Sequence, residues 1–162
     1  FADKLGREVL VMERFLNLRN KPGGNHMFLN VVPLTPDASK GALETFQSHA
    51  QKHNWEFKVI PAEQIASAAE GGNIWAAQRN AIRDTVQGRE YLVAILPDGS
   101  VLIHVINRGE RHPMNFGREV MSDLLGCPER GDWKTCSMTT PEEEKVAEDV
   151  KALFKSYDPF ME

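Results

Sequence analysis

Apolar residues are concentrated in two runs near the start of the chain, and these predict two paired strands. Residues 8–16 form the first run, and residues 26–34 form the second. Between them, residues 17–25 are rich in Gly, Pro and Asn, which favour a loop. Strands joined by such a loop form a hairpin, so we expect these two to pair.

A second hairpin is predicted near the middle of the chain. Residues 91–96 and 101–106 are almost continuously apolar and flank Pro97-Asp98-Gly99-Ser100, a sequence typical of a turn. Both faces of such strands are usually covered. Residues 55–60 predict one further short strand.

Helix signals account for most of the remaining chain. Apolar residues recur there at helical spacing, with capping residues or Pro near the starts and Gly near the ends. The predicted helices span residues 36–53, 61–70, 74–87, 114–125 and 140–157. Asn73 is expected to cap the third helix, and Thr140 begins a capping-box pattern for the last. The inner face of the fourth helix is expected to carry Phe116, Val120, Leu124 and Leu125.

The composition is that of a globular protein. The chain has 162 residues, of which 41 % are hydrophobic and 26 % charged, so it can form one ordinary domain or two small ones. Gly71-Gly72 is the best internal boundary. No apolar run approaches the roughly 18 to 20 residues that span a bilayer, so no membrane partner is expected. The chain begins without Met and almost at once with strand-like sequence, so we expect an upstream part to be missing.

Charge and cysteine content exclude several function classes. The net charge of −4 argues against bulk, sequence-blind adhesion to nucleic acid but permits a local basic patch. Cys127 and Cys136 form no disulfide framework, which favours a reducing compartment, and their spacing does not fit zinc. No phosphate-binding glycine loop or serine nucleophile motif is present. We therefore expect neither a metal nor a cofactor.

Three alternating residues of the second strand are the first candidates for a site. His26, Phe28 and Asn30 would share one face of a strand. This arrangement resembles the strand of the histidine-triad superfamily, in which the middle His is the nucleophile. Phe28 occupies the middle position here, and a phenyl ring has no lone pair with which to attack phosphorus. The alternative is that His26 is merely a satisfied polar residue of the strand.

Sequence segments in both halves resemble the CwfJ-like family of spliceosome-associated proteins, also called Cwf19-like. The C-terminal resemblance rests on residues 112–120, which contain Phe-Gly-Arg-Glu-Val, on residues 124–134, which contain Asp-Trp-Lys, and on residues 154–160. The opening segments 6–14, 24–27 and 31–34 are similar to the end of the preceding family domain. The resemblance covers nearly the whole chain, in the expected order.

The resemblance implies an α+β fold in two modules. Residues 1–70 would be the C-terminal part of a histidine-triad-like domain with an antiparallel sheet, and residues 71–162 a smaller α+β module. Family members with an intact pattern have a second His where Phe28 stands. The implied context is nuclear pre-mRNA splicing, around intron lariat turnover. The implied partners are spliceosomal proteins, intron lariat RNA or small nuclear RNA, and a lariat-debranching enzyme.

Several further residues are candidate contacts to RNA or to a protein partner. They are Arg19, Lys21, Asn25, Arg118, Trp133 and Lys134. Arg118 lies near a helix N-terminus and would grip phosphate, unless it pairs with a carboxylate such as Asp98 or Glu119. Trp133 would stack on a base, unless it anchors its loop on the core. Arg79, Arg83 and Arg89 form either a basic stripe or an ordinary solvated helix face.

Three functional hypotheses remain open at this stage. The leading one is a binding module whose triad has lost its nucleophile. The second is a phosphodiesterase or RNase in which His104 or His112 replaces the missing His, within about 5 to 6 Å of His26. For His104, the alternative is a core residue that holds one hydrogen bond. The third hypothesis is a protein-docking scaffold that does not contact RNA.

Overall fold

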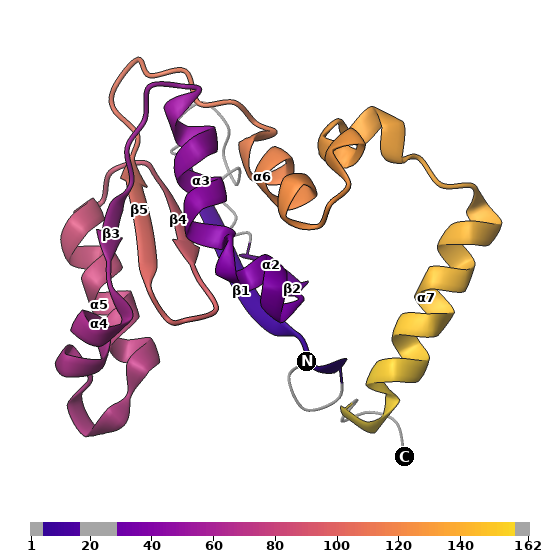
Figure 1. Ribbon diagram of the computed structural model, residues 1–162, viewed down its shortest axis with the longest axis horizontal. Helices are drawn as coiled ribbons and strands as arrows, with labels where there is room; N and C mark the ends of the chain where they lie inside the picture. The colour runs from indigo at the N-terminus through magenta and orange to yellow at the C-terminus, as the bar shows by residue number, and fades with distance from the viewer. Residues whose placement is uncertain (1–4, 17–28, 158–162) are drawn as a thin grey trace. The chain divides into compact units, whose positions relative to one another are not determined.

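The computed structural model describes residues 5–16 and 29–157, and the chain divides into two compact units, residues 1–131 and 132–162 (Figure 1). His26, Phe28, Arg19, Lys21 and Asn25 therefore lie outside the described residues. No helix in the described part of the chain has the length and apolar character needed to cross a bilayer.

The first unit is built on a five-stranded antiparallel sheet with the strand order β2-β1-β4-β5-β3. The strands are β1 (Glu8–Phe15), β2 (Leu29–Leu34), β3 (Lys58–Ile60), β4 (Tyr91–Ile95) and β5 (Val101–Val105). β1 pairs with β2, and β4 pairs with β5, so both pairings expected from the hairpins are confirmed. The expected α+β class is confirmed as well.

The helices occupy the positions that the periodicity predicts, with shifted ends. They are α2 (Pro36–Lys40), α3 (Ala42–Gln51), α4 (Ala62–Ala68), α5 (Ile74–Val86), α6 (Phe116–Leu124) and α7 (Thr140–Phe154). Short 3-10 turns are η1 (Glu70–Gly72), η2 (Pro128–Gly131), η3 (Trp133–Cys136) and η4 (Lys155–Tyr157). The helix expected over 36–53 is interrupted at Gly41, whose backbone N–H bonds back to Ala38 and Ser39.

α5 begins and ends where its capping signals place it. The Asn73 side chain accepts a hydrogen bond from the backbone N–H of Ala76 at 3.0 Å, which satisfies one free donor of the first turn. At the other end, Gln87 adopts a left-handed conformation with φ of 49°, and its N–H donates to the Arg83 carbonyl. Both ends were predicted from the sequence.

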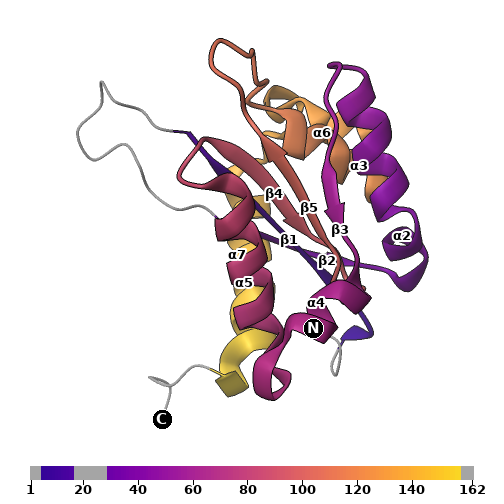
Figure 2. The ribbon, with the colours of Figure 1, turned by 90° about the vertical axis from the view of Figure 1, so that its left-hand side faces the viewer.

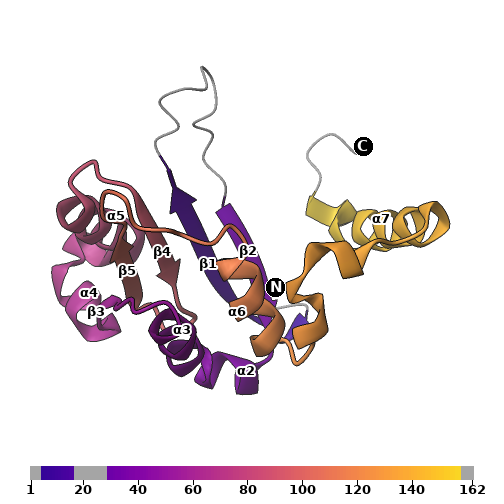
Figure 3. The ribbon, with the colours of Figure 1, turned by 90° about the horizontal axis from the view of Figure 1, so that it is seen from above.

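Helices cover the two faces of the sheet unequally. α3 and α6 lie on one face, and α4 and α5 lie on the other (Figure 3). The first core contains Leu10, Phe46, Leu102, Phe116 and Val120. The second lies under α4 and α5 and contains Ile65, Val93, Val101 and Ile103. On α6, Phe116 and Val120 are buried as expected, but Leu125 is 51 % exposed because α6 ends one residue earlier.

The division expected at residues 70 and 71 runs through one continuous sheet. β1, β2 and β3 come from the first segment, and β4 and β5 come from the second. β1 pairs with β4 over residues 11–15 and 91–95, so strands of the two segments are direct neighbours. The assignment of the segments to two family domains stays a prediction.

The second unit consists mainly of α7. Its capping residue is Thr139 rather than Thr140, because the side chain of Glu142 accepts from the Thr139 backbone N–H at 2.8 Å and completes a capping box. This contact lowers the pKa of Glu142. The apolar residues at helical spacing on α7 are all more than a third exposed; they are Val146, Val150, Leu153 and Phe154.

An aromatic cluster joins β5 to the segment that leads into α6. The indole of Trp55 stacks on His104 and on His112, with ring centroids 4.9 and 4.3 Å apart. Both ring nitrogens of His112 are buried and lack a hydrogen-bond partner among the described residues. Burial, aided by the positive charge of Arg14, lowers the pKa of His112 to about 4. The His112 ring therefore packs as a neutral group.

This cluster predicts a loss of stability in acid. The pKa of His112 is about 4 in the folded chain and ordinarily 6.5, so the unfolded chain binds more protons between these values. The contribution of His112 is fully present above pH 6.5 and falls as the pH approaches 4. We expect His112→Phe, which keeps a ring against Trp55, to lose less stability than the wild type between pH 7 and pH 5. Urea unfolding at both pH values measures this, and equal losses would contradict it.

The contact between α6 and β1 predicts that substitutions at Gly117 and Met12 have coupled effects on stability. A methyl group added at Gly117 would collide with the thioether end of Met12. Overpacking typically costs 1–3 kcal/mol, and the gain in helix propensity from Ala offsets about 1 kcal/mol of that. We expect Gly117→Ala to destabilise the wild type but to be better tolerated with Met12→Val, with a coupling of about 1 kcal/mol or more. Urea unfolding of the four proteins measures the coupling, and additive effects would refute the contact.

Candidate anion-binding site

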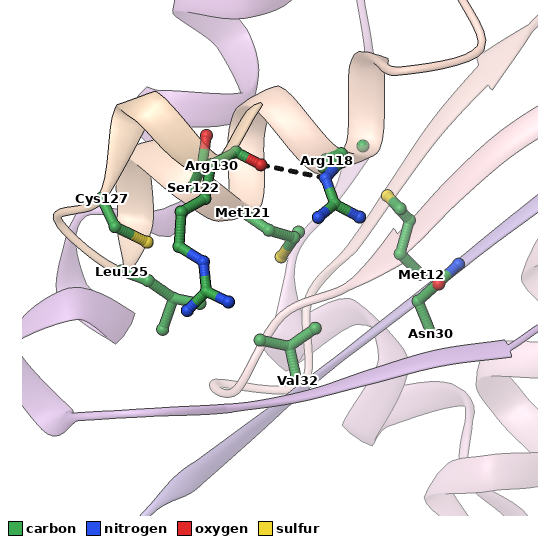
Figure 4. Close-up of a pocket in the computed structure, with 10 residues that line it drawn as sticks. Met12, Asn30, Val32, Arg118, Met121, Ser122, Leu125, Cys127 and Arg130 are labelled. Atoms are coloured by element: carbon green, nitrogen blue, oxygen red, sulfur yellow. Dashed lines mark hydrogen bonds between the residues drawn. The ribbon is translucent and has the colours of Figure 1, made fainter. Parts of the chain in front are cut away.

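A pocket of about 320 Å³ opens between the sheet and α6 within the first unit (Figure 4). One wall comes from β1 and β2, and the opposite wall comes from α6 and η2. The lining residues are Met12, Asn30, Val32, Gly117, Arg118, Met121, Ser122, Leu125, Cys127 and Arg130. Asn30 and Arg118, two residues predicted for separate reasons, therefore meet in one site.

Strand register places Asn30 at this pocket. Asn30 pairs with Met12 and Val32 pairs with Leu10, whose side chain is in the core beneath α6. Successive side chains of a strand point to opposite faces, so Asn30 and Val32 share the face that α6 covers. The expectation that Asn30 faces a site is consistent with this register. Its predicted companions, His26 and Phe28, are among the residues that the structure does not describe.

Close packing of α6 forms the other wall. Gly117 allows the first turn of α6 to approach the Met12 side chain on β1. After α6, the chain folds back through η2, and the Cys127 N–H donates to the Ser122 carbonyl at 2.8 Å. A Cβ at Gly131 would lie 3.2 Å from the Ser122 hydroxyl, so η2 also packs tightly on α6.

Arg118 is held in place by the end of η2. Its Nε donates to the Arg130 carbonyl at 2.9 Å, which fixes one edge of the guanidinium and leaves the two terminal nitrogens directed into the pocket (Figure 4). The Arg130 side chain also extends into the space above Val32 (Figure 4). Two guanidinium groups from different turns thus line one small pocket.

Arginines are the charged residues of the pocket. Among the described residues that line it, two are arginines and none is a carboxylate. The expected alternative, an ion pair of Arg118 with Asp98 or Glu119, is wrong for the described residues. Asp98 accepts hydrogen bonds from Ser100 instead, and Glu119 accepts one from the Asn115 side chain.

His104 and His112, the predicted substitutes for a missing His, are engaged in packing. His104 has two hydrogen bonds rather than the single one expected, to the Glu56 carbonyl at 3.1 Å and to the Glu110 carboxylate at 2.6 Å. The Glu110 contact contributes to a lowered pKa of that carboxyl, against the opposing effect of its burial. His112 has its nitrogens enclosed, as described above. Their predicted distance of about 5 to 6 Å from His26 stays a prediction, because His26 lies outside the described residues.

Trp133 and Lys134 lie in the second unit, on η3. Trp133 is 64 % exposed, and the Lys134 backbone N–H donates to the Asp132 side chain at 3.0 Å. Within the described residues, Trp133 is therefore not buried in a core. Whether it contacts RNA stays a prediction.

Arg130 and Cys127 also line the pocket, although neither was a predicted site residue. The sequence pattern does not indicate this role, because both residues lie in segment 124–134 without the spacing of a recognisable binding motif. No group of three or more metal-ligating side chains occurs in the described parts of the chain. The arrangement can bind an anion through charge and hydrogen bonds, with Val32 and Met121 providing apolar contact beside it.

Comparisons with known proteins identify the family of the chain. The family described as "Protein similar to CwfJ C-terminus 2" matches residues 69–159. The chain is 34 % identical over 135 residues to zinc finger CCCH domain-containing protein 64 of Arabidopsis thaliana, covering 83 % of this chain and 21 % of that protein. It is 31 % identical to zinc finger CCCH domain-containing protein 59 of Oryza sativa, with the same coverage.

A human protein matches over almost the entire chain. CWF19-like protein 1 of Homo sapiens is 27 % identical over 163 residues, which is 98 % of this chain and 26 % of that protein. The chain thus spans about a fifth to a quarter of the curated relatives it matches. The family match extends over more than half of the chain and includes α6, η2 and α7, so the chain belongs to the family of proteins similar to the CwfJ C-terminus.

Proposed function

We propose that the chain is a nuclear binding module of pre-mRNA splicing that holds an RNA phosphate in the pocket between β2 and α6. The observation that carries this proposal is the Arg118 guanidinium, which the Arg130 carbonyl holds with its terminal nitrogens directed into the pocket that Asn30 also lines. Membership of the CwfJ family and relatives named CWF19-like support the splicing context. Intron lariat or small nuclear RNA, spliceosomal proteins and a lariat-debranching enzyme are the proposed partners.

The shape of the pocket suits a nucleotide unit rather than a bare anion. The terminal nitrogens of Arg118 can donate two parallel hydrogen bonds to phosphate oxygens, a geometry that guanidinium groups favour. The Asn30 amide can hydrogen-bond to a sugar hydroxyl or a base edge. Val32, Met121 and Leu125 offer apolar surface to the sugar or base.

The surroundings of His104 and His112, the histidines proposed as substitutes, favour binding over hydrolysis. A nucleophilic imidazole needs a nitrogen that can reach the phosphorus. His104 uses both nitrogens in hydrogen bonds, and those of His112 are buried against Trp55. Neither residue lines the Asn30–Arg118 pocket. Neither histidine proposed as a substitute is therefore placed to act at this pocket.

A phosphate contact by Arg118 predicts a change in salt dependence. For single strands, each lost phosphate contact lowers the slope of log K against log salt concentration by about 0.7. We expect Arg118→Ala to weaken binding of single-stranded intron RNA and to lower the slope by about that amount. Fluorescence anisotropy across a salt series measures both quantities.

Arg108→Ala is the matched control. This substitution removes the same charge, and Arg108 is exposed and lies outside the pocket. An unchanged slope for Arg118→Ala, or an equal change in the control, would refute a specific phosphate contact. Loss of binding to protein partners alone would instead support the docking-scaffold hypothesis.

Loss of the triad nucleophile predicts crosslinking without cleavage. On intron lariat RNA, we expect ultraviolet crosslinks that weaken when Arg19→Glu is combined with Lys21→Glu, and no RNA cleavage. Electrophoresis of the same reactions reports both outcomes. Cleavage that disappears with His26→Ala would overturn the binding proposal and establish a substitute catalytic group.

A further inference from the structure

A second depression, of about 640 Å³, lies on the opposite face of the sheet from the Asn30–Arg118 pocket. α5 runs along this face beside the strands (Figure 2). The core under α4 and α5 draws its buried strand residues from β3, β4 and β5. Among the described residues, a groove runs between α5 and the side chains that β1 and β2 present on this face of the sheet.

The groove has an apolar interior. On the sheet side, Phe15 stacks on Tyr91 with ring centroids 5.6 Å apart, and Leu29 is 52 % exposed. On the helix side, Trp75 and Ile82 are seven residues apart, two turns along one stripe of α5, and Trp75 is 68 % exposed. Large apolar side chains in a continuous exposed groove indicate an interaction site rather than ordinary surface.

Arginines form one rim of the groove. Arg79 and Arg83 are one turn apart on α5, or about 6 Å along its axis. Arg79 has no hydrogen bond or ion pair with any described residue, and Arg83 has only a 3.4 Å contact with the exposed Asp84. The lining also holds one carboxylate, Glu13; burial and this nearby negative charge raise the pKa of Tyr91 to about 12.

A buried polar group completes the wall. Gln78 is 3 % exposed, and its Nε2 donates to the Gly99 carbonyl at 2.9 Å. Its Oε1 accepts no hydrogen bond from any described residue. The groove therefore combines apolar surface with the arginines of α5, and Arg89, whose guanidinium donates to the Val86 and Thr85 carbonyls, lines it as well.

We propose that this groove docks an acidic amphipathic helix of a protein partner. Apolar side chains at positions i, i+4 and i+7 of that helix would fill the groove, and carboxylates one turn apart would pair with Arg79 and Arg83. Single-stranded RNA fits less well. Polar base edges would face an apolar interior that offers them few hydrogen-bond partners.

Selection from a random 16-residue peptide library, displayed on phage against the folded chain, tests this proposal. We expect the enriched peptides to carry helically spaced apolar residues and at least two Asp or Glu. We expect their affinity, measured with synthetic peptides, to fall at least tenfold for Arg79→Glu with Arg83→Glu. The matched control is Arg108→Glu with Arg111→Glu, which makes the same charge change at exposed positions outside the groove.

Arg79→Lys with Arg83→Lys keeps both charges and should retain most of the binding. Enriched peptides that lack acidic residues, or that bind the reversed variant equally well, would overturn the proposal. So would crosslinking of single-stranded RNA that disappears only with the Arg79 and Arg83 reversal. Self-association in sedimentation that the same reversal abolishes would show that a second copy occupies the groove instead.

Discussion

The close approach of α6 to β1 is the contact on which the candidate site depends. Because Gly117 has no side chain, the first turn of α6 leaves room for the thioether end of the Met12 side chain. That approach places Arg118 over the strand that carries Asn30. It also allows the chain after α6 to fold back so that the Arg130 carbonyl receives the Arg118 Nε. One missing methyl group thus helps to set the spacing of the whole pocket.

The two faces of the sheet have separate chemistry because helices cover them differently. On the face of α3 and α6, the apolar core adjoins a small pocket lined by Arg118 and Arg130. On the other face, α4 and α5 bury residues of three strands, and the groove beside them is wider and more apolar. Because the two surfaces lie on opposite faces of the sheet, the RNA and the protein helix that we propose as ligands would not compete for the same residues.

The sequence predicts the strands and helices better than the tertiary contacts between them. The strands and helices follow from hydrophobic period and capping residues, as with Asn73 and α5. Asn30 and Arg118 were each selected, but 88 residues of chain separate them, and no local pattern indicates that they share a pocket. Arg130 was missed because its role arises from its backbone carbonyl and from the return of η2, which depend on tertiary packing.

The position of β2 in the sheet has a consequence for the behaviour of the chain in solution. Among the described residues β2 has a neighbour on one side only, so it is an edge strand with backbone groups available to other chains. Pro33 lies within this strand, opposite Val9, and supplies no N–H. Proline is tolerated in an edge strand where its nitrogen faces the open side, so an incoming strand would lack a donor at that residue. The proline limits the tendency of this edge to template fibrillar assembly while leaving the pairing with β1 in place.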